Sequence, residues 1–217
     1  MRKENKRYLL LSIYTLAAFL LWTSAIQLID VQAIGPGESD VGFATINRFV
    51  HNLTGVHMSL YTITDWLGLV PLAFVAGFGA LGLFQWIKRK HIGQVDHSIL
   101  VLGVFYLVVM AAFILFEEFV VNYRPVLING HLEASYPSST TMLVMCVMPT
   151  AIMQFHVRIK NDTVKRWITS AITAFIVFMV LGRLISGVHW VTDIIGGALL
   201  SAGLVLMYRA MIDLEAL

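Results

Sequence analysis

Six long apolar stretches without a charged side chain constrain this chain more than any other feature of its sequence. A bilayer core of about 30 Å is crossed by a helix of about 20 mostly apolar residues. The six stretches are Tyr8–Ile26, Leu67–Ile87, Ile99–Phe116, Ser138–Phe155, Trp167–Leu181 and Ile194–Tyr208. We therefore predict an all-α fold, an integral membrane six-helix bundle that forms one domain over residues 1–217. The last two stretches are short unless their polar ends continue as helix.

The composition excludes the main soluble classes. Charged residues make up 13% of the chain, against about 25% in a soluble domain, and the mean hydropathy is +0.79. A net charge of +2 is too small to indicate a nucleic-acid partner, so we expect membrane lipids as partners and no nucleic acid. The single cysteine, Cys146, excludes an internal disulfide framework and a thiolate metal cluster.

The positions of Lys and Arg predict the orientation in the membrane. Twelve of the fifteen fall on one side, and the other side has only Arg48, Arg124 and Arg183. This positive-inside bias predicts a multi-pass protein of a cell (plasma) membrane with both termini in the cytoplasm. The first stretch has a basic flank like that of a signal peptide, but its apolar run is longer than a signal core, so we expect it to be retained.

The longest segment between spans, residues 27–65, is expected on the outer side. Gly35-Pro36-Gly37 breaks the chain, and Asp40 is a candidate helix cap. Apolar residues then recur at helical spacing from Phe43 to Leu53, which is typical of an amphipathic helix on the membrane surface. A loop packed on the bundle and a substrate gate are the alternatives.

Glycines gather in the second and sixth stretches, and we expect them to let helices pack closely. They are Gly77, Gly79, Gly82, Gly196, Gly197 and Gly203. The five tryptophans lie near the ends of the predicted spans, as in an aromatic belt. They are Trp22, Trp66, Trp86, Trp167 and Trp190.

Three segments combine polar or ionisable side chains with span ends on the same expected side. Such side chains are costly near a bilayer and usually mark function or paired structure. The segments are residues 117–125, which end in Arg124-Pro125, residues 136–141, which open the fourth span, and residues 182–193, which join the last two spans.

Together these segments form a coherent set for binding a phosphate. The arginine fork matches phosphate oxygens, and the N–H groups at a helix start favour an anion. If His189 and Asp193 share a helix, their spacing puts them on one face, so the carboxylate can hold the imidazole while its other nitrogen attacks phosphorus. Each residue alone has an ordinary structural interpretation, and only their convergence favours function.

The same residues resemble a known family. Arg124-Pro125, then Pro137-Ser138, then Arg183 with five residues to His189 and three more to Asp193, is similar to the motif order of the type-2 phosphatidic acid phosphatase family. Its superfamily includes the vanadium haloperoxidases. The resemblance covers about residues 117–197, with Gly182 where the family usually has Ser.

The resemblance implies a metal-independent membrane phosphatase or phosphotransferase without a cofactor, which acts on a lipid phosphate or diphosphate. Its substrate would be a phospholipid or a polyprenyl phosphate, such as polyprenyl diphosphate, phosphatidic acid or phosphatidylglycerophosphate. The catalytic residues it implies are His189, as the nucleophile that forms a phosphohistidine, and Asp193, which orients it. The substrate-binding residues are Arg124, Ser138, Ser139, Thr140 and Arg183, at the outer membrane face.

The chain departs from the family at two positions. Glu117 stands where the first motif begins with Lys, and Thr140 stands where the second motif has the His that protonates the leaving group. Such proton transfer is worth about 10²- to 10⁴-fold. Since a diphosphate leaving group needs protonation less, the departures shift the expected substrate towards lipid diphosphates. Glu117, Glu118 and His131 are candidate substitute acids.

A second interpretation is a catalytically degenerate family member that binds or transports a phosphorylated lipid. Glu117 and Thr140 are the residues that motivate it. A covalent phosphohistidine intermediate would separate the two interpretations, because only the enzyme forms one.

Overall fold

The computed structural model describes residues 3–212, and they form eight α-helices and a two-stranded sheet. The α-helices are α1 (Lys3–Leu28), α2 (Ala44–Thr54), α3 (Met58–Leu67), α4 (Leu69–Arg89), α5 (His97–Glu118), α6 (Ser139–Arg158), α7 (Asp162–Ile185) and α8 (Val191–Met211). The strands are β1 (Gln32–Ala33) and β2 (Asp40–Val41), which pair antiparallel. Short 3₁₀ turns lie at Pro36–Glu38 and Ile92–Gln94.

Six helical segments are long and apolar enough to cross a membrane, which agrees with the predicted six-helix fold. The structure lengthens the predicted spans. Helices α3 and α4 together form one span from Met58 to Arg89, which begins nine residues before the predicted Leu67. Helix α7 continues through Arg183 and α8 already includes Asp193, so the polar ends of the last two spans are helical.

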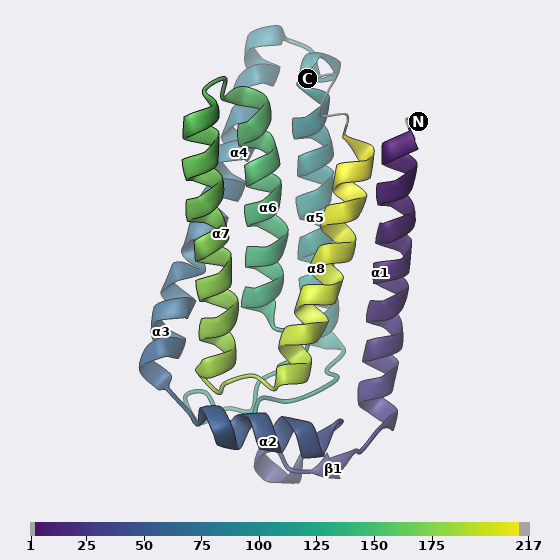
Figure 1. The fold of residues 1–217 in the computed structure, drawn as a ribbon, viewed down its shortest axis with the longest axis vertical. Coiled ribbons are helices and arrows are strands. Elements are labelled where there is room, and N and C mark those ends of the chain that lie inside the picture. Colours follow the sequence, from purple (N-terminus) through teal and green to yellow (C-terminus); the bar gives the residue numbers. More distant parts are fainter. Residues whose placement is uncertain (1–2, 213–217) are drawn as a thin grey trace.

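The helices run alternately up and down, and this places the polar loops at two opposite ends of the bundle (Figure 1). We call the lower end in that view, which holds α2 and the loops 119–138 and 186–190, the site end. The other end holds the start of α1, the end of α8 and the turns 90–96 and 159–161, and we call it the basic end. Both described chain ends therefore share one end of the bundle.

Helices α6 and α8 form the centre of the bundle. More than half of the apolar window of each is buried, against about a tenth for the α3–α4 span. Helix α1 packs along α8 (Figure 1), and Ser12 donates a hydrogen bond of 2.7 Å to the carbonyl of Gly203. A Cβ atom on Gly203 would lie 2.6 Å from Leu16, so this glycine does permit the close approach that the sequence predicts.

The glycine prediction is wrong for part of α4. A Cβ atom added to Gly77 or Gly79 would meet no atom within 4 Å, so no neighbouring helix explains the small residues there. Gly82 differs, because its Cβ atom would lie 3.0 Å from Ile99. Gly77 and Gly79 therefore border open space, whereas Gly82 lies at a close contact with α5.

The outer segment does form a helix, α2, which crosses the site end of the bundle (Figure 1). Asp40 does not cap it, because Asp40 lies in β2, and Asp30 instead accepts a hydrogen bond of 2.7 Å from the N–H of Thr45. Asn47 is buried and fixes α2 to the start of α8 by a 3.0 Å hydrogen bond to Thr192. Its apolar residues Ile46, Phe49 and Leu53 stay exposed, so a place on the membrane surface remains the prediction.

Candidate active site

A hairpin-like loop between α5 and α6 brings the first two motif segments close together. Tyr123 pairs with Ala134, and the N–H of Arg124 donates to the carbonyl of Glu133 at 3.1 Å. The turn at Asn129 and Gly130 has two positive φ angles, 51° and 81°, which suits the Asn-Gly pair of a tight hairpin turn. Residues on the two arms of this loop therefore lie side by side although they are distant in sequence.

The third segment meets this loop at the start of α8. His189 lies in the connection before the helix and Asp193 lies in its first turn, so the two do not share a helix face as the spacing suggested. The N–H of Trp190 donates to the Asp193 carboxylate at 2.9 Å, and Asn122 donates to its other oxygen at 3.2 Å. Both His189 and Asp193 are buried.

Ser135 links the histidine to the carboxylate, and no motif singled it out. Its hydroxyl donates to Asp193 Oδ2 at 2.6 Å and lies 3.0 Å from His189 Nδ1. A serine hydroxyl has one proton, so when it donates to the carboxylate it must accept from Nδ1–H. This arrangement leaves His189 Nε2 with a free electron pair, the form that a nucleophile needs.

The environment of His189 also favours the neutral imidazole. Burial lowers the pKa of His189 well below its ordinary value, and the positive charges of Arg124 and Arg183 lower it further. His189 Nε2 accepts a hydrogen bond of 3.2 Å from the Arg124 guanidinium, so its electron pair lies beside a cation that could hold a phosphate oxygen instead. An unprotonated imidazole beside an anion-binding group is suited to attack on phosphorus.

The two buried arginines both lie close to one aromatic ring, that of Tyr61. The guanidinium of Arg183 is 4.9 Å from the centre of the Tyr61 ring, and that of Arg124 is 6.0 Å from it. Such contacts are favourable for a cation over a ring face. Tyr61 belongs to the part of the α3–α4 span that the sequence analysis placed in a loop, so its role was missed.

Each arginine already has a carboxylate neighbour. Arg183 lies 3.4 Å from Asp65 on α3, and Arg124 Nε lies 3.1 Å from Glu133 on the hairpin loop. Both carboxylates are much more exposed than the arginines they pair with. A phosphate that enters the site would therefore replace exposed carboxylates as the partner of two buried guanidinium groups.

The start of α6 also contributes to this site, with one difference from expectation. The N–H of Ser138 donates to the carbonyl of Asp193 at 3.1 Å, so it is not free to bind an anion. The hydroxyl of Ser138 is buried and has no hydrogen-bond partner among residues 3–212, and the same is true of Arg183 Nε. Buried polar atoms are nearly always paired, so these two atoms indicate a place for a polar ligand.

Two cavities open next to these groups. A small one is lined by Glu117, Ser135, Ser139 and His189. A larger one of about 380 Å³, which we call the site groove, has Asp65, Ser139 and Thr140 at its polar end and apolar side chains of α4, α5 and α6 along the rest. The small cavity, of about 10 Å³, has room for about one water molecule. The site groove could hold an apolar chain with its polar end near Ser139 and Thr140.

The structure separates the three candidate substitute acids. Glu117 lines the small cavity together with His189. Glu118 is exposed at the end of α5, and His131 is exposed at the turn of the hairpin loop, where it pairs with Ile128. Neither Glu118 nor His131 is among the residues that line this small cavity. Within residues 3–212, no three His, Cys, Asp or Glu side chains lie close enough together to hold a metal ion.

Comparison with known proteins finds a family match over the part of the chain that carries this site. Residues 118–215, which contain Arg124, Ser138, Arg183 and His189, match the PAP2 superfamily. None of the curated proteins matches the chain in sequence.

One solved structure has a similar fold, that of the first transmembrane PAP2-type phosphatidylglycerolphosphate phosphatase from Bacillus subtilis. It is 19% identical, the match covers 92% of this chain and 93% of that chain, and the TM-score is 0.59. Residues 118–215, which carry the second and third motif segments and all of the first but Glu117, thus match the PAP2 superfamily, and the chain has the fold of a transmembrane PAP2-type phosphatase.

Proposed function

We propose that this protein is a PAP2-family membrane phosphatase or phosphotransferase that acts on a lipid phosphate or diphosphate through His189. One observation carries the proposal. The unprotonated Nε2 of a buried imidazole accepts a hydrogen bond from Arg124, and its Nδ1 is tied to Asp193 through Ser135. The unpartnered Ser138 hydroxyl and Arg183 Nε support it, because a phosphate offers acceptors to both.

In the first step, His189 Nε2 attacks phosphorus and the bond between phosphorus and the lipid oxygen breaks. The lipid oxygen leaves with a proton, and the phosphoryl group stays on His189 while Arg124 and Arg183 neutralise its charge. In the second step, water attacks phosphorus, the N–P bond breaks and phosphate leaves. A lipid hydroxyl in place of water would make the same reaction a phosphotransfer.

We assign the proton of the first step to Glu117, which would act in place of the absent histidine at position 140. Of the three candidates, Glu117 is the one that lines the small cavity beside His189. A protonated Glu117 donates to the leaving oxygen and then accepts a proton from the attacking water, so the cycle ends where it began. Asp65 is a poorer choice, because its carboxylate pairs with Arg183.

The lining of the site groove and the comparison together favour two candidate substrates. The site groove runs from Ser139 and Thr140 along apolar side chains, and this supports a substrate with a hydrocarbon chain. By analogy with the Bacillus subtilis protein, phosphatidylglycerolphosphate is one candidate substrate. Polyprenyl diphosphate is the other main candidate, since a phosphate leaving group needs less protonation.

The test uses the purified full-length protein in detergent with phosphatidic acid, phosphatidylglycerophosphate and polyprenyl diphosphate. We expect phosphate release from at least one, loss of that release in His189→Ala, and an acid-labile phosphoprotein trapped on His189 after rapid quenching. If His189→Ala releases phosphate as fast as the parent, the assignment of the nucleophile is wrong.

The alternative function, a binder or transporter of a phosphorylated lipid, has one specific observation in its favour. Both arginines keep carboxylate partners, and the histidine expected at position 140 is a threonine. A binder would retain lipid phosphate in a way that depends on Arg124 and Arg183, without turnover and without a phosphoprotein. Such a result would replace the enzymatic proposal.

A further inference from the structure

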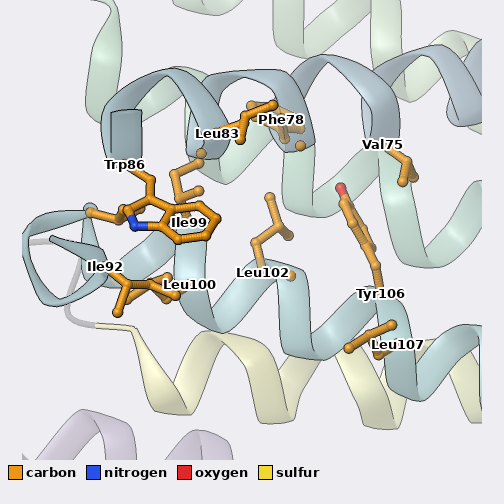
Figure 2. Close-up of a pocket in the computed structure, with 14 residues that line it drawn as sticks. Val75, Phe78, Leu83, Trp86, Ile92, Ile99, Leu100, Leu102, Tyr106 and Leu107 are labelled. Atoms are coloured by element: carbon orange, nitrogen blue, oxygen red, sulfur yellow. The ribbon is translucent and has the colours of Figure 1, made fainter. Parts of the chain in front are cut away.

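A second groove lies between α4 and α5 near the basic end, away from the site described above. We call it the basic-end groove. It has a volume of about 450 Å³ and is lined almost entirely by apolar side chains (Figure 2). In that view α4 runs above it and α5 below, with Trp86 and Ile92 at one end and Tyr106 at the other.

Small residues on both helices keep this groove open. Gly79 and Gly82 of α4 and Gly103 of α5 line it, and a Cβ atom at Gly79 or Gly103 would meet no atom within 4 Å. A glycine inside a helix costs about 1 kcal/mol relative to alanine. Since no side chain of this chain fills the space beside Gly79 and Gly103, we look for a ligand that does.

The basic-end groove and the site groove meet at Val75 and Tyr106, which line both. The Tyr106 hydroxyl is fixed by a 3.3 Å contact with Thr150 on α6. Tyr106 lies nine residues after the start of α5 at His97, which is about 14 Å along a helix and about half of a bilayer core. The site groove therefore lies along the half of the span nearer the site end, and the basic-end groove along the half nearer the basic end.

The mouth of the basic-end groove carries positive charge. Helix α4 ends in Lys88 and Arg89, and Lys90 follows. Arg89 is paired with Asp96 at 3.0 Å, but no ion pair with a carboxylate is found for Lys88 or Lys90 within residues 3–212. Half-exposed Trp86 lines the groove just before this cluster, where an indole N–H can bind a lipid oxygen.

We propose that the basic-end groove binds one hydrocarbon chain of an anionic phospholipid from the leaflet at the basic end, with the phosphate of that lipid held by Lys88 and Lys90. Three observations carry this: an apolar groove about one leaflet deep, glycines beside which the space is open, and two lysines just after Trp86 that form no ion pair within residues 3–212. The ammonium group of Lys88 lies 5.8 Å from the centre of the Phe84 ring, a contact that a lipid phosphate would compete with. Clusters of basic residues next to a span attract anionic lipids. The site does not depend on the proposed phosphatase activity.

Native mass spectrometry of the full-length protein in detergent tests the proposal, with phosphatidylglycerol and phosphatidylcholine as the probes. We expect one phosphatidylglycerol to stay bound, with a Kd at least about tenfold lower than that of phosphatidylcholine. Lys88→Gln with Lys90→Gln should remove this preference, and Lys160→Gln, a change of an exposed lysine in another turn at the same end, should not.

Filling the groove provides the second arm of the test. Gly79→Leu with Gly103→Leu should abolish retention of phosphatidylglycerol. Gly77→Leu is the matched control, because Gly77 also borders open space on α4 but lies outside the basic-end groove. A circular dichroism melt confirms that each variant is folded, and a double variant that does not fold is replaced by Gly79→Leu alone.

Three results would overturn the proposal. The first is equal affinity for the two lipids, and the second is a filled variant that still retains phosphatidylglycerol. The third is a filled variant that changes the oligomeric mass of the protein but not its lipid content, which would make the groove a contact between copies of the chain. His189→Ala separates this site from the phosphatase site, since it should leave retention of phosphatidylglycerol unchanged.

Discussion

Two polar networks cross the helix bundle, one at each end, and they differ in how completely they are paired. At the basic end, Asp96 accepts from Gln85 at 2.8 Å and from Arg158 at 3.2 Å, and Gln154 joins Arg158 to Tyr208. At the site end, the network around His189 and Asp193 borders buried polar atoms that have no partner.

This difference in hydrogen bonding between the two ends holds for all of the described residues. Each buried side-chain polar atom without a hydrogen-bond partner in residues 3–212 belongs to a residue at the site end. They include Ser138 Oγ, Thr141 Oγ1 and Arg183 Nε. A fully paired network holds helices together. In an incompletely paired one, the desolvation cost of the buried polar groups is not offset by hydrogen bonds, so it lowers stability. The comparison supports a structural role for the basic-end network and the proposed ligand-binding role for the site-end network.

The largest expected effect contrasts one arginine from each network. Arg183→Gln should lower kcat/KM by about 10³-fold, because it removes a donor aimed at the charge that develops on phosphate. Arg158→Gln should change kcat/KM by less than about threefold but lower the free energy of unfolding by about 1–3 kcal/mol, because it breaks hydrogen bonds to a charged group. Phosphate release and thermal melts of both variants test this pair.

The contrast would be wrong if the two variants had the same effects on phosphate release and on melting temperature. A strong loss of activity in Arg158→Gln without a change in melting temperature would show that the basic-end network also serves catalysis. A normal rate in Arg183→Gln would mean that its unpartnered Nε has no ligand to bind.

A smaller effect is expected for the exposed carboxylates beside the site-end network. Glu117→Gln should lower the rate on a lipid phosphomonoester by about 10²-fold, because it removes the proton donor for a poor leaving group. The loss on a lipid diphosphate should be clearly smaller. Glu118→Gln, the neighbouring exposed carboxylate, is the matched control and should have no effect on either substrate. Equal losses for Glu117→Gln on both substrates would argue against its role as the acid.

The sequence could predict the helices because membrane spans depend on composition over many residues. Six uncharged stretches were enough for the fold, and the motif spacing was enough to select Arg124, Arg183 and His189. The start of α3 could not be predicted in the same way, since Tyr61 and Asp65 are polar or amphipathic residues that interrupt the uncharged apolar pattern of a span. The predicted second span therefore missed the residues that contact Arg183.

The link from His189 to Asp193 through Ser135 could not be predicted from the sequence for a different reason. It depends on the hairpin loop, whose hydrogen bond between Ser135 and Asn122 places two arms in register. Spacing within one segment suggests i, i+4 neighbours, but it carries no information on a loop that folds back from another segment. The apparent pair of His189 and Asp193 is in fact joined through a third residue.

Ser135 provides the third prediction. Ser135→Ala should lower kcat by about 10-fold with little change in KM, because it frees His189 from the partner that fixes its tautomer without removing a phosphate contact. Ser135→Thr keeps the hydroxyl and should recover part of the rate. Ser201→Ala is the matched control, since Ser201 is also buried but donates to the carbonyl of Met142. A similar loss in Ser201→Ala would point to packing rather than to the link.

The smallest expected effect concerns the charge on His189 in the free protein. Since burial and the two arginines lower the pKa of His189, its imidazole should stay neutral when the pH falls from 8 to 6. An ordinary histidine with a pKa of about 6.5 would lose about three quarters of its neutral form at pH 6. The ¹⁵N chemical shifts of labelled histidine, assigned by comparison with His189→Gln, report both the charge and the tautomer. We expect a proton on Nδ1 and none on Nε2 across this range. A proton on Nε2 at pH 7 would mean that the link to Asp193 does not set the tautomer of His189. The two networks would then differ in hydrogen bonding, but the site-end network would not hold His189 in the form that a nucleophile needs.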